Sequence, residues 1–245
     1  TKSVADAIHA NDYFLMNGGV LNLTSSADGI ECESGFIDIR GGSLTVNCVD
    51  DGVVTTYSGT DAAITPYISI TGGTIGITTS GEKGSAIKSE SQTFINNTSA
   101  ITLKVSGRAS KGIKTGKDLT ITDCSITATT SGAAFYDSSE ADIASSAGIN
   151  CDGNLLISAG TITITSSGSG GKGITVDGTI TLNGGNITIT TSGAVYKYTT
   201  SLTTEPKGIK SDGACTVNGA KLIISSNDDG IKSENSVVVN SGSVT

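Results

Sequence analysis

The stretch Lys172-Gly-Ile-Thr-Val-Asp-Gly-Thr-Ile-Thr-Leu-Asn-Gly-Gly-Asn-Ile-Thr-Ile-Thr190 decides the fold of this 245-residue chain. Apolar and polar residues alternate in three short runs, near 173–176, 179–182 and 186–190, and such alternation is typical of strands with one buried face. The turns Asp-Gly and Asn-Gly-Gly separate the runs, and both supply residues that tolerate a positive φ. Three strands joined by three corners predict one coil of a parallel β-helix.

The same template recurs along most of the chain. Each unit begins with a Gly-Ile pair or with a degenerate Gly-Val or Ala-Ile pair. These pairs start at Gly29, Gly52, Ala86, Gly112, Gly148, Gly173, Gly208 and Gly230. The shortest spacings set a coil of about 22 to 26 residues, which indicates a repeat architecture rather than separate domains. We therefore predict an all-β, single-stranded, right-handed parallel β-helix (a solenoid) of about eight coils, with residues 21–245 as one domain.

A solenoid places equivalent residues above one another and leaves two open ends. The apolar residue after each repeat glycine should form one buried column, made of Ile30, Val53, Ile87, Ile113, Ile149, Ile174, Ile209 and Ile231. Leu155, Ile180 and Cys215 should belong to a second column. We expect residues 1–20 to form the N-terminal cap and the C-terminal cap to lie outside this sequence.

The composition limits the classes of function. The net charge is −8, and phosphate binding needs clustered cations, so we do not expect nucleic acid as a partner. No apolar run approaches the roughly 20 residues that cross a bilayer, so we expect no membrane span. His9 is the sole histidine, which disfavours histidine-based catalysis. The five cysteines match no zinc motif and are expected to be small core residues.

Three aspartates predict a metal site. Asp28 and Asp51 both precede a repeat glycine, so they should lie one above the other, about 5 Å apart at the backbone. Asp50 adds a third carboxylate beside them. Stacked carboxylates repel one another unless a cation lies among them, and hard oxygen ligands suit Ca²⁺. The alternative is a solvated acidic turn.

Three inserts, residues 57–67, 133–146 and 194–206, leave the corners of the predicted scaffold. Loops that project from a rigid scaffold often hold binding groups. A column of lysines on one face could also pair with the carboxylates of an acidic glycan. The side chains expected to bind ligand are Tyr57, Tyr67, Phe135, Tyr136, Tyr196, Tyr198, Lys88 and Lys114. Two alternatives stay open: the lysines form a solubilising surface, and the tyrosines decorate long loops.

Several motifs together resemble a known family. The segments Asp28-Gly-Ile, Gly41-Gly-Ser-Leu-Thr-Val, Asp50-Asp-Gly-Val and Ile70-Thr-Gly-Gly-Thr-Ile look like those of bacterial carbohydrate-binding β-helix proteins related to calcium-dependent pectate lyases. The resemblance extends over nearly the whole chain from about residue 12. It implies a secreted or cell-surface-anchored bacterial protein, with a lipid anchor possible upstream of Thr1. It also implies polysaccharide as the partner, namely acidic plant polysaccharide such as polygalacturonate, and cellulose. We expect an acidic, uronate-containing plant or host glycan that is bound with the help of calcium.

The resemblance also implies roles for individual residues. In the related lyases an aspartate on one coil and an aspartate pair on the next hold calcium, which corresponds to Asp28, Asp50 and Asp51. The lyases have a further aspartate near the position of Val54, and their lysine base lies roughly where Lys88 stands.

Binding is favoured over cleavage, because a base must be neutral and a lysine beside acids such as Glu90 tends to stay charged. The alternatives are a calcium-dependent polysaccharide lyase with Lys88 as its base, and a non-catalytic structural or adhesive solenoid.

Overall fold

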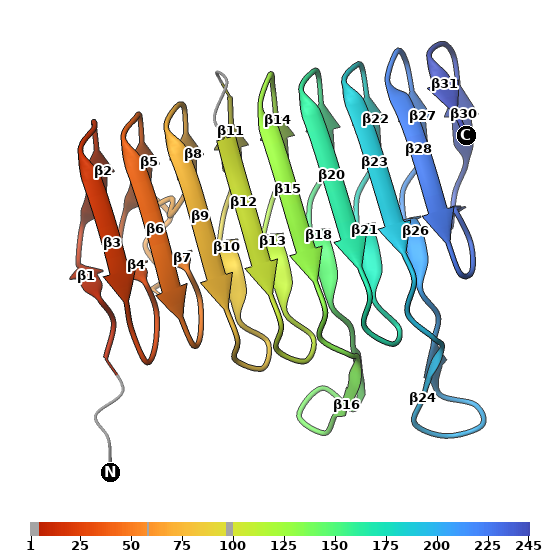
Figure 1. The fold of residues 1–245 in the computed structure, drawn as a ribbon, viewed down its shortest axis with the longest axis horizontal. Helices are drawn as coiled ribbons and strands as arrows, with labels where there is room; N and C mark the ends of the chain where they lie inside the picture. The colour runs from red at the N-terminus through yellow and green to blue at the C-terminus, as the bar shows by residue number, and fades with distance from the viewer. Residues whose placement is uncertain (1–4, 58, 97–99) are drawn as a thin grey trace.

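The computed structural model describes residues 5–57, 59–96 and 100–245 (Figure 1). Within these ranges the chain has no helix, and therefore no helix that could span a membrane. Three sheets of nine parallel strands run along one axis, and each coil adds one strand to each sheet. The predicted right-handed parallel β-helix is thus confirmed.

The strands of each sheet are short. Sheet A consists of β1 (Ile8–Ala10), β4 (Ile30–Cys32), β7 (Val53–Thr55), β10 (Ser85–Ser89), β13 (Lys111–Thr115), β18 (Ala147–Cys151), β21 (Lys172–Val176), β26 (Lys207–Ser211) and β29 (Ile231–Ser233). Sheet B consists of β2 (Tyr13–Met16), β5 (Phe36–Ile39), β8 (Ile68–Ile70), β11 (Thr93–Ile95), β14 (Leu119–Ile121), β19 (Leu155–Ile157), β22 (Ile180–Leu182), β27 (Cys215–Val217) and β30 (Val237–Val239). Sheet C consists of β3 (Val20–Thr24), β6 (Ser43–Cys48), β9 (Thr74–Thr79), β12 (Ala100–Val105), β15 (Ser125–Thr130), β20 (Thr161–Ser166), β23 (Asn186–Thr191), β28 (Lys221–Ser226) and β31 (Ser243–Val244).

The described residues form nine coils, one more than the repeat pairs indicated. Within the segment 1–20, which we expected to form a cap, β1 and β2 pair in register with β4 and β5. Residues 1–4 of that segment lie outside the described residues. Ile8 aligns with Ile30, and Ala7-Ile8 is a degenerate pair, of the same kind as Ala86-Ile87, that the predicted repeat units did not include.

The predicted columns form the core. The column in sheet A is aligned from Ile30 to Ile231, and Leu155, Ile180 and Cys215 are aligned in sheet B. All five cysteines are buried and free, as expected for core residues.

In several coils glycine is required where the strand of sheet A begins, because the backbone there packs against sheet C. A Cβ atom on Gly173 would lie 2.3 Å from Cγ2 of Ile189 and 2.4 Å from the carbonyl oxygen of Gly208. Gly52 and Gly148 meet Ile77 and Ile164 in the same way. A side chain therefore does not fit at these three positions, whereas alanine occupies the same column at Ala7 and Ala86.

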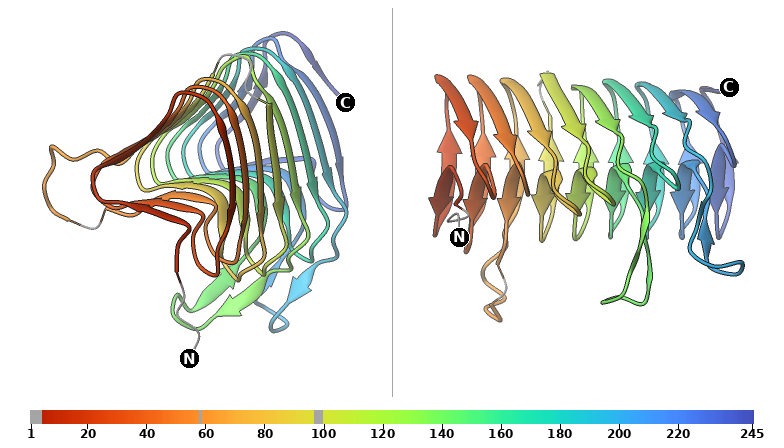
Figure 2. Two further views of the ribbon diagram at one scale, coloured as in Figure 1. Left: turned by 60° about the vertical axis from the view of Figure 1, so that its left-hand side comes forward. Right: turned by 60° about the horizontal axis from the view of Figure 1, so that its bottom comes forward.

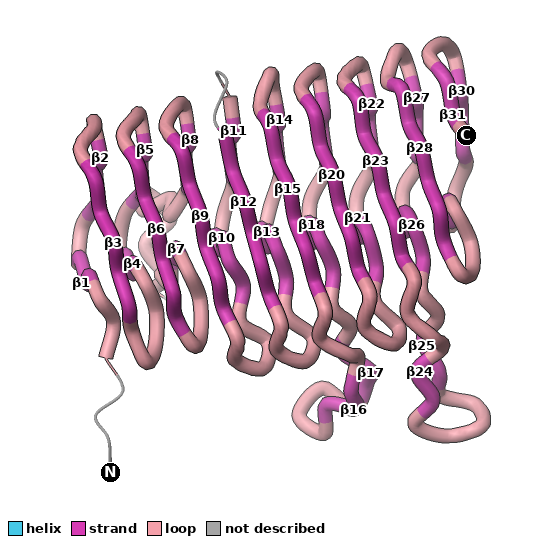
Figure 3. The backbone as a smooth tube through the Cα atoms, viewed as in Figure 1, coloured by secondary structure: helices cyan, strands magenta, loops and turns pink. Residues whose placement is uncertain are grey.

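The inserts leave two different corners (Figures 2 and 3). Two antiparallel hairpins project between sheets C and A: hairpin 1 is β16 (Phe135–Asp137) with β17 (Asp142–Ala144), and hairpin 2 is β24 (Tyr196–Lys197) with β25 (Thr203–Thr204). The loop made of residues 57 and 59–67 projects between sheets A and B, away from the hairpins. The outer face of sheet A therefore lies between the hairpins and this loop.

Candidate functional site

One residue per coil, directly before the repeat glycine, lines the edge of sheet A beside the hairpins. Backbone pairing and hydrogen bonds between successive coils place these residues in one column. We call it the edge column; from the second coil to the ninth it contains Asp28, Asp51, Ser85, Lys111, Ala147, Lys172, Lys207 and Asp229. Its early members are acidic and its later members are mostly basic.

The acidic part of the edge column brings Asp28, Asp50 and Asp51 together. One carboxylate oxygen from each of them lies within 4.8 Å of the others. Oδ1 of Asp28 accepts a hydrogen bond from the backbone nitrogen of Asp51 at 2.7 Å, and Oδ1 of Asp51 accepts one from that of Ser85 at 2.6 Å. Each aspartate therefore binds the backbone of the next coil, and the two stack as the register predicts. We call these three residues the aspartate cluster.

Two members of the aspartate cluster have pKa values above the ordinary range. Burial, together with the charges of Asp51, Asp50 and Asp6, raises the pKa of Asp28 to about 7, although the hydrogen bond from Asp51 opposes this. Burial and the charge of Asp51 also raise the pKa of Asp50. A cation among the carboxylates would favour their charged forms.

The donor set of the aspartate cluster fits a hard divalent cation. Over the described ranges, no hydrogen bond engages Oδ2 of Asp28 or either carboxylate oxygen of Asp50. Ca²⁺ takes six to eight oxygen ligands, so water or a bound carboxylate would supply the others. Val54 is fully buried and apolar, so it provides no ligand at the position where the resemblance implied a further aspartate.

Lys88 lies beside the aspartate cluster. Its Nζ donates a hydrogen bond of 2.8 Å to Oδ2 of Asp51, whose side chain is 6% exposed. Burial alone would lower the pKa of Lys88, but the charge and hydrogen bond of Asp51 outweigh burial and raise it. The amine therefore stays charged, which suits an ion pair and not a proton-abstracting base.

Two basic members of the edge column hold the roots of the hairpins. Nζ of Lys111 donates a hydrogen bond to the carbonyl oxygen of Ser145, at the end of hairpin 1. Nζ of Lys172 donates to Oγ1 of Thr204 at 2.7 Å and to the carbonyl oxygen of Glu205, at the end of hairpin 2. Lys172 is 6% exposed, and neither amine forms an ion pair with any carboxylate that the structure describes.

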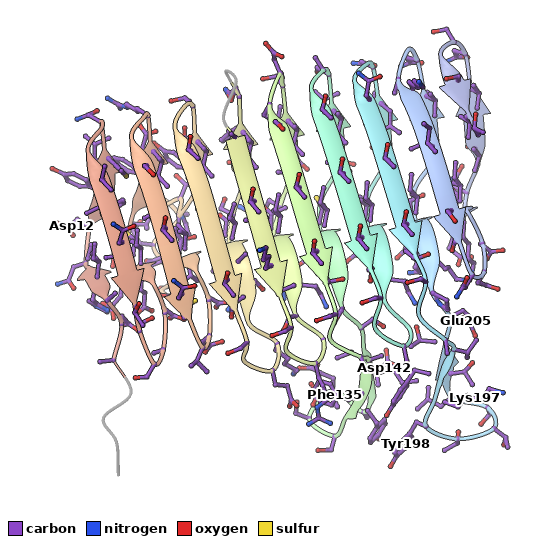
Figure 4. The ribbon with its side chains drawn as sticks, viewed as in Figure 1. Asp12, Phe135, Asp142, Lys197, Tyr198 and Glu205 are labelled. Atoms are coloured by element: carbon purple, nitrogen blue, oxygen red, sulfur yellow. The ribbon has the colours of Figure 1, made fainter. Side chains whose placement is uncertain are left out.

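These lysines line a groove of about 370 Å³ on the outer face of sheet A, which we call the lysine groove. Hairpin residues Asp142, Ser145 and Thr204 form its wall, and Figure 4 shows Asp142 on the projecting hairpin. Its floor comes from sheet A and includes Lys111, Asn150, Lys172, Thr175 and Lys210.

The predicted ligand residue Lys114 does not line the lysine groove. It lines an adjoining hollow of about 400 Å³ on the other side of hairpin 1, with Lys83 and Glu140. Lys111 and Asn150 border both spaces. The two hollows thus follow each other along sheet A.

The predicted aromatic ligands are divided between the hairpins and the loop. The rings of Tyr136 and Tyr198 stack, with centroids 3.9 Å apart, and Oη of Tyr196 accepts a hydrogen bond from the backbone nitrogen of Tyr136 at 3.2 Å. These contacts join hairpin 1 to hairpin 2. Phe135 packs under the guanidinium of Arg108, 4.6 Å from the ring centroid.

Tyr57 and Tyr67 lie at the two ends of the loop, distant in the fold from the hairpin tyrosines. Oη of Tyr57 accepts a hydrogen bond from the backbone nitrogen of Asp61 within that loop at 2.9 Å. The ring of Tyr67 stacks on Phe36 with centroids 5.2 Å apart, in an aromatic row that includes Tyr13 and Phe94. The structure thus places these two tyrosines apart from the other aromatic candidates.

The predicted ligand residues did not include Lys111 and Lys172. Their position in the repeat could have identified them. Lys111 is aligned with Ala147, which follows the insert of hairpin 1, and Lys172 is aligned with Lys207, which follows the insert of hairpin 2. A long cationic side chain under the root of an insert can reach the carbonyl groups of that root.

Comparisons with known proteins identify the family. No curated protein and no solved structure matches the chain. A family described as carbohydrate-binding domain-containing protein matches residues 1–109, 101–193 and 167–245. The three overlapping matches extend over the whole chain, as expected for a sequence built from repeats. The chain therefore belongs to the family of carbohydrate-binding domain-containing proteins.

Proposed function

We propose that this protein binds acidic, uronate-containing polysaccharide along the outer face of sheet A, with calcium held by the aspartate cluster. The observation that supports this most is the gathering of Asp28, Asp50 and Asp51 within 4.8 Å on an edge that leads into the lysine groove. A divalent cation lets an acidic protein hold an acidic polymer, because it lies between carboxylates that would otherwise repel one another.

The residues that would hold calcium are Asp28 and Asp50, with Asp51 shared between calcium and Lys88. Calcium supplies positive charge and open coordination positions when bound. The protein side chains fix one side of this site, because backbone hydrogen bonds hold Asp28 and Asp51 in place. The side facing solvent is left for sugar carboxylates and water.

The direction of the glycan follows from the column geometry. Coils are about 4.8 Å apart, so the coil of Lys111 lies about 10 Å along the axis from the coil of Asp51. A polymer that runs parallel to the axis would meet the aspartate cluster first and the lysine groove next. The hairpins would stand along one side of it.

The test is calorimetric titration with polygalacturonate, in calcium and in chelator. Wild-type protein is expected to bind in calcium and to lose most of its affinity in chelator. Asp28→Asn and Asp50→Asn should remove the effect of calcium. Asp12 is an exposed aspartate of the first coil outside the cluster (Figure 4), so Asp12→Asn should leave the effect of calcium unchanged. Calcium-dependent binding that survives both cluster variants would show that calcium acts elsewhere.

The lyase alternative depends on Lys88, and the ion pair with Asp51 argues against it. Incubation of polygalacturonate with protein and calcium should give no rise in the ultraviolet absorbance of unsaturated product. The structural or adhesive alternative predicts no affinity for any glycan in the titration.

We expect the protein to be secreted or anchored at the bacterial cell surface, because polysaccharides of this kind are found outside the cell. Surface labelling of intact cells tests this location.

A further inference from the structure

The lysine groove contains positive charge that nearby carboxylates do not neutralise by direct pairing. Lysine is seldom buried unless its charge is paired. Lys207, the next member of the edge column, shows the usual solution: its Nζ donates to Asp228 at 2.6 Å and to Asp229 at 2.9 Å. Lys111 and Lys172 have only carbonyl and hydroxyl oxygens as acceptors in the part of the chain that the structure describes.

The pKa values follow this difference in pairing. Burial lowers the pKa of Lys207, but its hydrogen bonds to Asp228 and Asp229 outweigh burial, and the net shift is upward. Burial and the neighbouring lysines lower the pKa of Lys111 to about 7 and that of Lys172 to about 8. An anion in the groove would give these two amines a negatively charged partner, such as Lys207 already has in Asp228 and Asp229.

The groove also offers hydrogen-bonding capacity for a ligand. An ammonium group has three donors, and Lys111 uses two of them, on the carbonyl oxygens of Ala109 and Ser145. Oγ1 of Thr175, on the floor of the groove, is buried and has no hydrogen-bond partner among the described residues. Lys210 adds a further cation on the floor, although its Nζ is shared with Asp212 at 2.9 Å.

We propose that the lysine groove is a carboxylate subsite that works without calcium, in which Lys111 donates its remaining N–H to a uronate carboxylate. Lys172 and Lys210 add positive charge, and Thr175 and Asn150 face the sugar hydroxyls. This inference rests on the proposed function, because it assumes that the ligand is an acidic glycan. It adds a second site, of opposite charge, to the aspartate cluster.

A consequence is that binding at this subsite takes up protons. A carboxylate favours the charged form of a neighbouring amine, so bound glycan raises the pKa of Lys111 and Lys172. Uptake is expected above pH 7, where these amines are partly neutral in the free protein. The charged groups around the two amines are Lys83, Lys114, Asp142, Asp152, Asp177, Glu205, Lys207, Lys210 and Asp228.

The experiment is calorimetric titration of the full chain with a galacturonate trisaccharide in chelator at pH 7.5. It is run in phosphate and in Tris, which differ in ionisation enthalpy. The wild type is expected to bind and to show net proton uptake. Lys111→Met should weaken binding about tenfold, as expected for the loss of one charge-assisted hydrogen bond. Lys104→Met, an exposed lysine on sheet C, is the matched control and should change nothing.

A second variant guards against misfolding of Lys111→Met, since that lysine holds hairpin 1. Asp142→Asn removes a negative charge from the wall and should tighten binding in chelator. Equal affinity of wild type, Lys111→Met and Asp142→Asn would overturn the subsite. Binding without proton uptake would overturn the inferred coupling between glycan binding and protonation of Lys111 and Lys172. Binding that occurs only in calcium would overturn the inference and leave the proposed function intact. No binding in either condition would overturn both.

Discussion

The carboxylate of Asp28 accepts a hydrogen bond of 2.7 Å from the backbone nitrogen of Asp51, 23 positions later in the chain. The contact repeats one coil on, where Asp51 accepts from Ser85. In the later coils the side chains of the column are donors instead of acceptors, because lysines of the same column donate to carbonyl oxygens of the chain one coil ahead. The edge column thus holds successive coils together by acceptors at one end and by donors further along.

The ion pair between Lys88 and Asp51 should stabilise the protein when calcium is absent. Lys88→Met leaves a buried carboxylate unpaired, which should cost about 3 kcal/mol of unfolding free energy in chelator, at the low end for a broken buried pair because Lys88 is partly exposed. Calcium should restore part of this loss, because the variant frees an oxygen of Asp51. Urea denaturation with and without calcium measures both effects. Lys232→Met, which breaks only the exposed pair with Glu234, is the control, and equal losses in the two variants would refute the assignment.

Gly173, a repeat glycine packed against sheet C, should tolerate no side chain. Gly173→Ala places a Cβ atom 2.3 Å from Ile189 and should cost about 1–3 kcal/mol through overpacking. Gly76→Ala is the matched control, because among the described residues, its two chain neighbours aside, no atom lies within 4 Å of its added Cβ. Thermal denaturation of both variants measures the difference. A stable Gly173→Ala would mean that sheet A can move away from sheet C at this corner.

The stacked rings of Tyr136 and Tyr198 should couple the two hairpins energetically. A double-mutant cycle with Tyr136→Ala and Tyr198→Ala is expected to give a coupling energy of about 0.5–1.5 kcal/mol, as for other aromatic pairs. Tyr57→Ala, in the separate loop, should be additive with either variant. Additive effects of the two hairpin tyrosines would show that the hairpins move independently.

Lys111 should make stability depend on pH. Its pKa is about 7 in the folded protein against an ordinary value of 10.5, so the unfolded chain binds more protons between these values. Unfolding free energy therefore rises with pH across this range, by up to about 1.4 kcal/mol per pH unit for one proton. Urea denaturation from pH 7 to pH 10 should show a smaller rise in Lys111→Met than in the wild type. The same rise in both proteins would contradict the assignment to Lys111.

The architecture could be predicted from the sequence because it depends on register and on short-range patterns. The alternation of apolar residues and the glycine before Ile174 are sufficient to place Ile174 above Ile149 and below Ile209. The first coil was missed because Ala7-Ile8 lies at the start of the chain with no unit before it, whereas the equally degenerate pair Ala86-Ile87 fills a gap between Gly52 and Gly112. The stacking of Asp28 on Asp51 follows from the same register.

The partners of long side chains could not be predicted in this way. Register places Lys88 on sheet A, but it does not say that its amine reaches Asp51 on the previous coil. Likewise, the repeat pattern locates Tyr136 and Tyr198 in two inserts without indicating that their rings meet. These contacts depend on rotamers and on the paths of the hairpins, and neither follows from a repeat.

The most direct test of the account is crystallographic: diffraction from the protein with calcium and a galacturonate oligosaccharide, including the anomalous signal of calcium. We predict an anomalous peak among Asp28, Asp50 and Asp51, with sugar density that runs from this peak along sheet A into the lysine groove. Sugar density on another face of the solenoid, with no peak at the three aspartates, would contradict it.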